Sequence, residues 1–487
     1  MRLNFPFPAP QPRWRALLAG LGLAFCLAFV ASCGGGDGGV VGSGGTGSPY
    51  GVAQGTVNGF GSIIVDGVSY DDRSASVVTE VAPGQDVLSG VKLGNRVSLD
   101  YQTAGVAQVV RVESALAGPV ASIVSATQFS MLGQDVRVNT SAITGPVTQF
   151  GGGYTQPGDV RAGDSIEVHG VVVVQGPAAL IQATRIDKLA SAPAYLRVTG
   201  VLANVVGGAS PAFTLGMLAV DATGASLLPA GALLANGQTV TLLALPGTLT
   251  QANAGPQLKA AEIRVAGVPA SGLDAYQSGS ISQLDTQATT FTLGSLLVRY
   301  AGAAIAPAGA SLENGRYVQV RGSAAADGAL VATAVMVRDG ESEAEAELKG
   351  NITGYVQSSN TFSVRGVRVD ASSAVLSGCP NTGLADGLYV EISGALGSNG
   401  VVATTVHCDS TEPANATVER EGLANAVDPT ALHFTLNPED GNAIVVSWSD
   451  LTYFGGVTPA TLTGNKVHAE GAIVNGVLVA TQVKLAD

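Results

Sequence analysis

The chain has 487 residues, 24 of them basic and 37 acidic, and a formal net charge of −13. This balance argues against a surface that binds nucleic acid or anionic lipid headgroups through basic residues. Aromatic residues make up 5% of the chain and charged residues 13%, whereas glycine occurs 65 times. Val, Thr, Ala and Leu alternate with polar residues between the glycines, and long helical periodicity is missing. This pattern predicts an all-β chain.

The first 32 residues have the features of a targeting segment. Three arginines precede an apolar run, which ends in Val30-Ala31-Ser32-Cys33. This ending resembles the bacterial lipobox, although the usual box has Leu in the place of Val30. The resemblance implies cleavage after residue 32 and lipidation of Cys33. An ordinary secretory signal is the alternative, and a transmembrane anchor is disfavoured because the run is shorter than the roughly 20 residues that a spanning helix needs.

Residues 33–51 are rich in Gly and Ser, so they are expected to form a flexible tether. The lipoprotein resemblance implies three acyl chains on Cys33, and more than one chain is needed for stable anchoring. Gly34 follows Cys33 where an inner-membrane retention signal would have Asp. We therefore expect a lipid-anchored protein of the outer membrane in the cell envelope. Whether it faces the periplasm or the cell surface stays open.

Three short sequence elements recur six times in the same order. The first is Phe-x-Leu-Gly with alternating apolar residues after it, and its glycine permits a turn or bulge between two strand halves. The second is Gly-x-x-Val-x-Val-x-Gly, and the third is Ala-Thr-x-Val. The first element is assigned to Phe60, Phe129, Phe213, Phe291, Phe362 and Phe434. The second begins at Gly94, Gly163, Gly237, Gly315, Gly387 and Gly464.

A fixed order of elements indicates an array of small, similar modules rather than one large core. The domains expected after the signal (1–32) and the tether (33–51) are module 1 (52–113), module 2 (114–190), module 3 (196–267), module 4 (275–340), module 5 (348–410) and module 6 (417–487). Their size and five or six short strands predict OB-like Greek-key β-barrels. Each module is expected to have its own small core, assisted by packing between neighbours. A continuous β-solenoid is the alternative.

The phrase Gly-Phe-Gly-Ser-Ile-Ile-Val-Asp-Gly-Val, from Gly59 to Val68, together with the second and third elements, resembles the domain of unknown function 5666 family. That family occurs as tandem repeats in exported bacterial proteins. The resemblance extends from about residue 52 to the end, and it is better in modules 1, 4 and 5 than in modules 2, 3 and 6. It implies an architecture and no reaction.

Cysteine and histidine positions give limited hints of a site. Cys379 and Cys408 lie in one module of an exported chain, which suggests a disulfide, with free thiols as the alternative. The four histidines, His169, His407, His433 and His468, are spread over the modules, so no zinc site is assigned. The acidic run of Glu341, Glu343, Glu345 and Glu347 is interpreted as a solvated hinge between modules 4 and 5, with a loose divalent-cation site as the alternative.

Three aromatic residues are candidate ligand contacts. Tyr317 and Tyr389 occupy equivalent places in the second element, one position out of step with the core valines, so their side chains are expected to point outward. Trp448 is the only tryptophan after the signal. Aromatic platforms are typical of ligand binding by OB-like barrels. The alternative for both tyrosines is an ordinary outward position on a strand.

No sequence motif indicates catalysis, because no nucleophile elbow, phosphate loop or carboxylate pair is found. No catalytic residue, metal ligand or cofactor is assigned. We expect a non-enzymatic, membrane-anchored lipoprotein that acts as a multi-domain binding or adhesion scaffold. Its expected partners are the membrane, through Cys33, and envelope proteins or glycans, but not nucleic acid. A purely structural envelope spacer is the alternative, and a glycan-acting enzyme is a third hypothesis.

Overall fold

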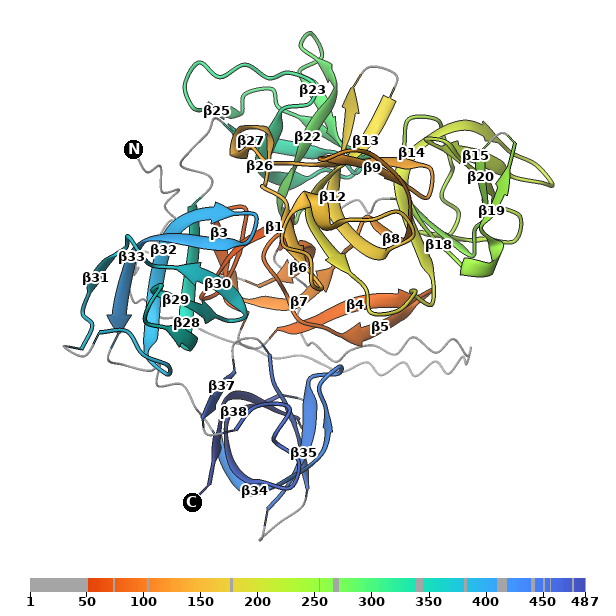
Figure 1. The fold of residues 1–487 in the computed structure, drawn as a ribbon. Helices are drawn as coiled ribbons and strands as arrows, with labels where there is room; N and C mark the ends of the chain where they lie inside the picture. The colour runs from red at the N-terminus through yellow and green to blue at the C-terminus, as the bar shows by residue number, and fades with distance from the viewer. Residues whose placement is uncertain are drawn as a thin grey trace, which may run out of the picture. The chain divides into compact units, whose positions relative to one another are not determined.

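The computed structural model describes residues 51–486 except for 73–74, 103–104, 176–177, 254, 266–270, 339–344, 381–382, 410–417, 439–442, 450–451, 456 and 475–476. Within this part of the chain there is no α-helix, and the strands are joined by turns and three 3-10 segments (Figure 1). These segments are η2 (Ala142–Thr144), η3 (Pro157–Asp159) and η4 (Pro246–Thr248). The all-β prediction is confirmed.

Module 2 shows how the strands form a barrel. Its strands are β8 (Leu116–Ser125), β9 (Gln128–Met131), β10 (Gln134–Val138), β11 (Gln149–Gly151), β12 (Ser165–Gln175) and β13 (Ala178–Lys188). β8 pairs with β9, β9 with β10, β10 in parallel with β13, β13 with β12, and β12 again with β8. This closed order of five strands is that of an OB-like Greek-key barrel, as predicted, and closure leaves no long sheet edge exposed.

Modules 4, 5 and 6 repeat this order strand for strand. Module 4 has β22 (Asp274–Asp285), β23 (Thr290–Leu293), β24 (Leu296–Arg299), β25 (Ala304–Ala306), β26 (Tyr317–Ala324) and β27 (Leu330–Val337). Module 5 has β28 (Glu345–Val356), β29 (Thr361–Val364), β30 (Val367–Asp370), β31 (Val375–Ser377), β32 (Tyr389–Gly397) and β33 (Gly400–Asp409). Module 6 has β34 (Val418–Asp428), β35 (His433–Asn437), β36 (Ile444–Ser447), β37 (Tyr453–Gly455), β38 (Lys466–Val474) and β39 (Val477–Leu485), seen as a closed ring in Figure 1.

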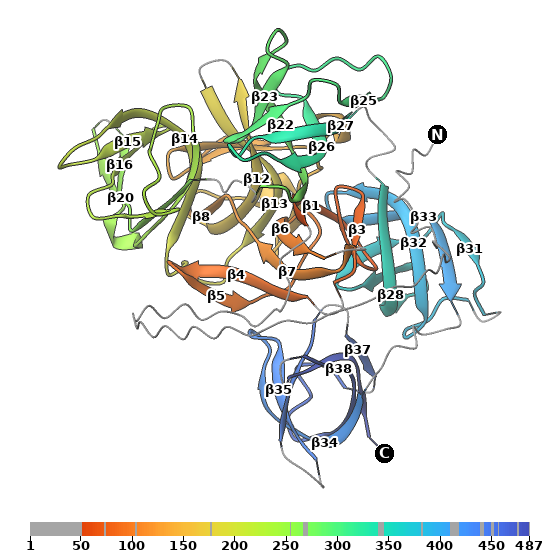
Figure 2. The same cartoon turned by 180° about the vertical axis from the view of Figure 1, so that it is seen from behind.

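Modules 1 and 3 vary the same plan. Module 1 has β1 (Gly51–Phe60), β2 (Ile63–Val65), β3 (Val68–Tyr70), β4 (Ser76–Ala82), β5 (Gln85–Leu88), β6 (Arg96–Tyr101) and β7 (Ala107–Val112), in which β4 and β5 form an additional hairpin (Figure 2). Module 3 has β14 (Leu196–Val206), β15 (Ala212–Leu215), β16 (Leu218–Asp221), β17 (Ser226–Leu228), β18 (Thr239–Ala244), β19 (Thr250–Ala252), β20 (Gly255–Lys259) and β21 (Glu262–Val265). Here β20 and β21 share the place of the fifth strand, because β20 pairs with β16 and β21 with β18.

The repeated glycines have two different structural roles. The first glycine of the second element, for example Gly315, has a φ between 82° and 88° in all six modules, so it makes the left-handed turn into the fourth strand. The closing glycine lies at a β-bulge, as between Arg321 and Gly322 in module 4. A Cβ atom at Gly322 would lie 2.0 Å from the carbonyl oxygen of Val331. The element therefore encodes a turn at its start and a close approach of two strands at its end.

The phenylalanine of the first element is a core residue in five modules, but Phe60 does not occupy the equivalent position. Ile63 in β2 lies opposite Tyr70, as Phe362 in β29 lies opposite Val369. Phe60 is the last residue of β1, although it is also buried. The assignment of Phe60 to the first element was wrong because module 1 joins its first two strands by a shorter turn.

Strand pairing continues from one module into another. β1 pairs in parallel with β22 of module 4 at Gly51–Gln54 and with β28 of module 5 at Gly59–Phe60. β8 of module 2 pairs with β14 of module 3. The buried apolar cluster of module 1 is continuous with that of module 5, and module 2 shares one with module 3. Separate cores are found in modules 4 and 6, so the expectation of one core per module is wrong for the other four.

The bulge glycine gives a direct test of the repeat. Gly322→Ala forces the Cβ atom against the Val331 carbonyl, so we expect a loss of about 1–3 kcal/mol in the stability of module 4. Gly279→Ala in the same module is the matched control, because its Cβ atom would meet nothing nearer than the Leu293 side chain at 3.8 Å. Hydrogen exchange of β26 and β27 measures the difference. Equal exchange rates in the two variants would contradict this role of the bulge.

Candidate functional site

The structure places the three candidate ligand contacts in different surroundings. Tyr317 is 1% exposed and Trp448 is 6% exposed, so neither side chain forms the surface platform that a ligand contact would need. Trp448 packs in module 6 between the rings of Phe434 and Phe454. Tyr389 is half-buried at the start of β32. Tyr317 does lie off the core face of its strand, as alternation requires, but another module covers it.

The polar cluster around Tyr317 joins module 4 to module 1. The Tyr317 hydroxyl lies 3.2 Å from both carboxylate oxygens of Asp66 and 2.9 Å from the Ser278 hydroxyl. Asp66 also accepts hydrogen bonds from the Thr56 N–H, at 2.8 Å, and from the Ser278 hydroxyl. The Arg96 guanidinium donates to the Ser278 carbonyl at 3.0 Å and to the Tyr317 hydroxyl at 3.4 Å. We call Thr56, Asp66, Arg96, Ser278 and Tyr317 the central junction.

The central junction is buried and contains two groups of opposite charge. Asp66 is 5% exposed and Arg96 is 8% exposed. The pKa of Tyr317 is raised to about 12, mainly by burial and secondly by the nearby Asp66 carboxylate. The Tyr317 hydroxyl therefore keeps its proton at neutral pH and can donate it in a hydrogen bond. The Tyr317 side chain also packs in one buried cluster with Val171 and Val173 of module 2. Three modules therefore meet at one tyrosine.

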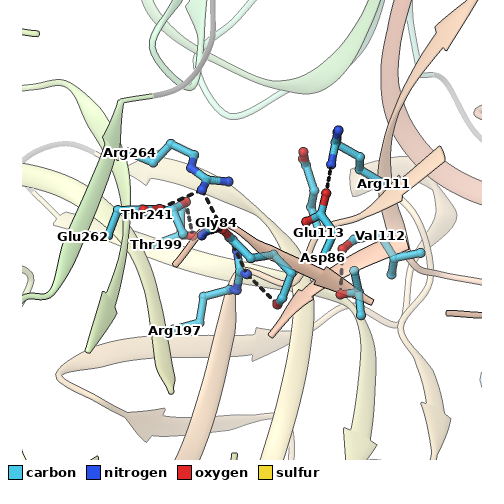
Figure 3. Close-up of polar contacts among 12 residues, drawn as sticks. Gly84, Asp86, Arg111, Val112, Glu113, Arg197, Thr199, Thr241, Glu262 and Arg264 are labelled. Atoms are coloured by element: carbon cyan, nitrogen blue, oxygen red, sulfur yellow. Dashed lines mark hydrogen bonds and ion pairs between the residues drawn. The ribbon is translucent and has the colours of Figure 1, made fainter. Parts of the chain in front are cut away.

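A second charged contact joins module 1 to module 3. Glu80 lies on the β4/β5 hairpin of module 1 and accepts hydrogen bonds from Arg197 at 3.1 Å and from Arg264 at 2.7 Å. Arg264 also donates to Glu262 at 2.7 Å, and Figure 3 shows these two residues. The Glu80 and Arg197 side chains are 9% and 11% exposed. Burial alone would lower the pKa of Arg264, but its hydrogen bonds to Glu80 and Glu262 raise it overall. We call this contact the hairpin junction.

Module 2 contacts module 1 through its fifth strand and the connecting segment. Thr184 donates to the carbonyl of Gly94 at 2.7 Å, and Arg185 donates to the carbonyl of Leu93 at 2.9 Å. His169 is buried, with its Nδ1 atom 2.9 Å from the carbonyl of Glu113. Burial lowers the pKa of His169, which keeps the ring neutral. His169 is thus a packing residue between modules.

The disulfide between Cys379 and Cys408 is confirmed. It ties the segment after β31 to the end of β33, across 29 residues of sequence. A loop of this length stabilises a fold by roughly 3–4 kcal/mol in the chain-entropy model. Beside it, His407 is exposed and its Nδ1 atom lies 3.0 Å from the Ser377 hydroxyl.

The remaining predicted sites are only partly covered by the structure. Cys33, Glu341 and Glu343 lie outside the described residues, and Glu347 is exposed on β28. In the described part of the chain, no group of three or more His, Cys, Asp or Glu residues is placed to hold a metal ion. Nor does any helix among these residues have the length and apolar character to cross a membrane.

The barrels and their repeats identify a family for part of the chain. Three segments, residues 117–187, 278–336 and 349–407, match the model of the domain of unknown function (DUF5666). These three segments are similar to that family. These segments lie in modules 2, 4 and 5, so the resemblance seen in the sequence is confirmed there. Module 1 was expected to match better than module 2, but it has Tyr101 in place of the closing glycine and carries the additional hairpin.

Comparison with other proteins adds little to this family match. No curated protein matches the chain. Among solved structures, one titled "drosophila Unr CSD456" is similar to 43% of this chain and 96% of its own, at 13% sequence identity and a TM-score of 0.14. A similarity of this level carries no functional argument. The assignment of OB-like barrels rests on the strand pairings.

The central junction was not predicted from the sequence, although the repeat contained a signal. Arg96 and Tyr317 occupy the same place, two residues after the first glycine of the second element. Tyr389 and Lys466 occupy the same place in modules 5 and 6. A large side chain there marks a position that another module can cover, as happens in modules 1 and 4. Asp66 gave no such signal, because it belongs to a turn where Asp is common.

Removing the Asp66 carboxylate should weaken the contact between modules 1 and 4. In Asp66→Ala, the donors of Thr56, Ser278 and Tyr317 lose their acceptor and the buried Arg96 loses the negative charge near it, so we expect a loss of about 3–5 kcal/mol. The control is Asp327→Ala, which removes an exposed pair with Arg299 and should leave the stability almost unchanged. Urea denaturation followed by hydrogen exchange of β22 measures both. Equal losses would show that the junction does not hold the modules together.

Proposed function

We propose that this chain is a lipid-anchored protein of the cell envelope that acts as a multi-domain binding or adhesion scaffold without catalytic activity. The observation that carries this proposal is the contact between modules. Parallel strand pairing of β1 with β22 and β28, the central junction and the hairpin junction tie distant modules to one another. A body of docked barrels presents several surfaces at fixed spacing, which suits multivalent binding.

The anchoring part of the proposal rests on the sequence. The lipobox-like residues before Cys33 and the Gly-rich segment after it suit a barrel array held at a membrane by acyl chains. A Gly-rich tether, as the composition of residues 33–51 predicts, would let the modules reach a partner some distance from the bilayer. Envelope proteins or glycans are the partners that this location offers.

Lipidation can be tested at a single residue. Cys33→Ser removes the acceptor of the acyl chains, so we expect the variant to lose labelled palmitate and to leave the membrane fraction. Cys26→Ser is the control, because Phe25 before it does not suit a lipobox. Metabolic labelling and fractionation of cells that express each full chain give the result. Membrane retention and label on Cys33→Ser would reject this anchor.

Binding is tested by capture from living cells. Crosslinking in intact cells, followed by purification of the full chain, should recover a reproducible envelope partner, and a glycan array should identify any sugar ligand. A ligand that is bound and released unchanged agrees with the scaffold. A protein partner without any glycan favours the structural spacer instead. Chemical turnover of a captured ligand would contradict the non-enzymatic proposal.

A further inference from the structure

One face of module 6 corresponds to the faces that join modules 1 and 4. In β34 and β38, Leu423 lies opposite Lys466, and Glu421 lies opposite His468. We call these four residues the β34/β38 face. The register places Leu423 and Lys466 where module 1 has Thr56 and Arg96 and where module 4 has Ser280 and Tyr317. The equivalence follows from the inward glycine that comes just before Leu423, Thr56 and Ser280 in the first strand of each module. Gly422 lies opposite Val467, Gly55 opposite Val97 and Gly279 opposite Val318.

The equivalent residues differ sharply in exposure. Thr56, Arg96 and Tyr317 are 1%, 8% and 1% exposed. By contrast, Leu423 is 43% exposed, and the Lys466 side chain is 38% exposed. The same strand positions are therefore covered by another module in modules 1 and 4 and open to solvent in module 6.

The contact between modules 1 and 4 shows what kind of surface fits this face. There, two equivalent faces meet each other, because the Arg96 guanidinium reaches the Tyr317 hydroxyl at 3.4 Å. Their first strands, β1 and β22, run in parallel side by side. Parallel pairing of equivalent strands is compatible with a near two-fold relation between two modules, which is the relation that makes a closed dimer.

The β34/β38 face has the chemistry of a self-complementary surface. An exposed leucine lies at its centre, and charges of both signs surround it. Glu421 pairs with Lys466 and lies 3.1 Å from the Nε2 atom of His468. On the outer side, Glu470 accepts a hydrogen bond from Gln482 at 2.8 Å. A two-fold axis can bring the lysine of one copy toward the glutamates of the other while the leucines are buried together.

We propose that the β34/β38 face is a homodimer interface, on which module 6 of a second copy of this chain docks through the same face. Leu423 is the apolar centre of the contact, and Glu421 and Lys466 pair across it. The dimer reproduces between chains the face-to-face contact that modules 1 and 4 make within one chain. It goes beyond the proposed scaffold role, since it doubles the number of modules that one assembly presents.

Crosslinking through cysteine tests the interface in cells that express the full chain. Leu423→Cys should give a species of twice the mass of one chain after treatment with a short bis-maleimide, at least tenfold above the parent chain. Leu233→Cys is the matched control, because this leucine of module 3 is 84% exposed and lies outside the proposed face. A doubled species that is no more abundant with Leu423→Cys than with Leu233→Cys would overturn the proposal.

Charge reversal gives a second measurement that does not depend on a new cysteine. Lys466→Glu places four like charges at the interface, so the dimer of the purified full chain should dissociate at least tenfold more readily in sedimentation experiments. Fluorescence of Trp448, which is buried in module 6, shows whether the variant module is folded. A folded Lys466→Glu variant with unchanged association, or a parent chain that sediments as a monomer at every concentration tested, would refute the interface.

Discussion

The size of one barrel is the constraint on which the rest of the structure depends. A closed five-stranded barrel of about 70 residues buries a smaller share of its surface than a large domain, so its own core stabilises it only weakly. In this chain the modules bury additional surface, because one module covers the outer faces of the first and fourth strands of another. Tyr317 and Arg96 show the consequence, since both lie on the side of the strand away from the barrel core and are still buried.

The parts of the fold that follow from local geometry could be predicted from the sequence. The first glycine of each second element is required by a left-handed turn, and the closing glycine by a bulge where Val331 approaches Gly322. Each of these conformational requirements involves only a few neighbouring residues, so it produces a repeated motif in the sequence. Phe60 shows the limit of prediction from such a motif. It fits the first element in type, but a shorter turn moves it to the end of β1.

The contacts between modules could not be predicted in the same way. Arg96 and Ser278 are 182 residues apart, and Asp66 and Tyr317 are 251 apart. Alternation along a strand says which side chains leave the core, but it does not say whether solvent or another barrel covers them. For this reason Tyr317 was expected at the surface. A residue that departs from the repeat is the better indicator, as Tyr101 shows: it stands in place of the closing glycine and donates to Asp274 of module 4 at 2.8 Å.

Buried charges at these contacts also explain how similar barrels find the right neighbours. Apolar cores built from the same repeat are nearly interchangeable, so they discriminate poorly between modules. A buried carboxylate is costly unless its own partners are present, and a wrong neighbour would leave it unpaired. Glu80 meets this condition only against Arg197 and Arg264 of module 3. Asp66 gains two further donors where the Ser278 and Tyr317 hydroxyls converge, beside the Thr56 N–H of its own module. The repeat therefore specifies the barrel, and the residues that break the repeat specify which barrels dock.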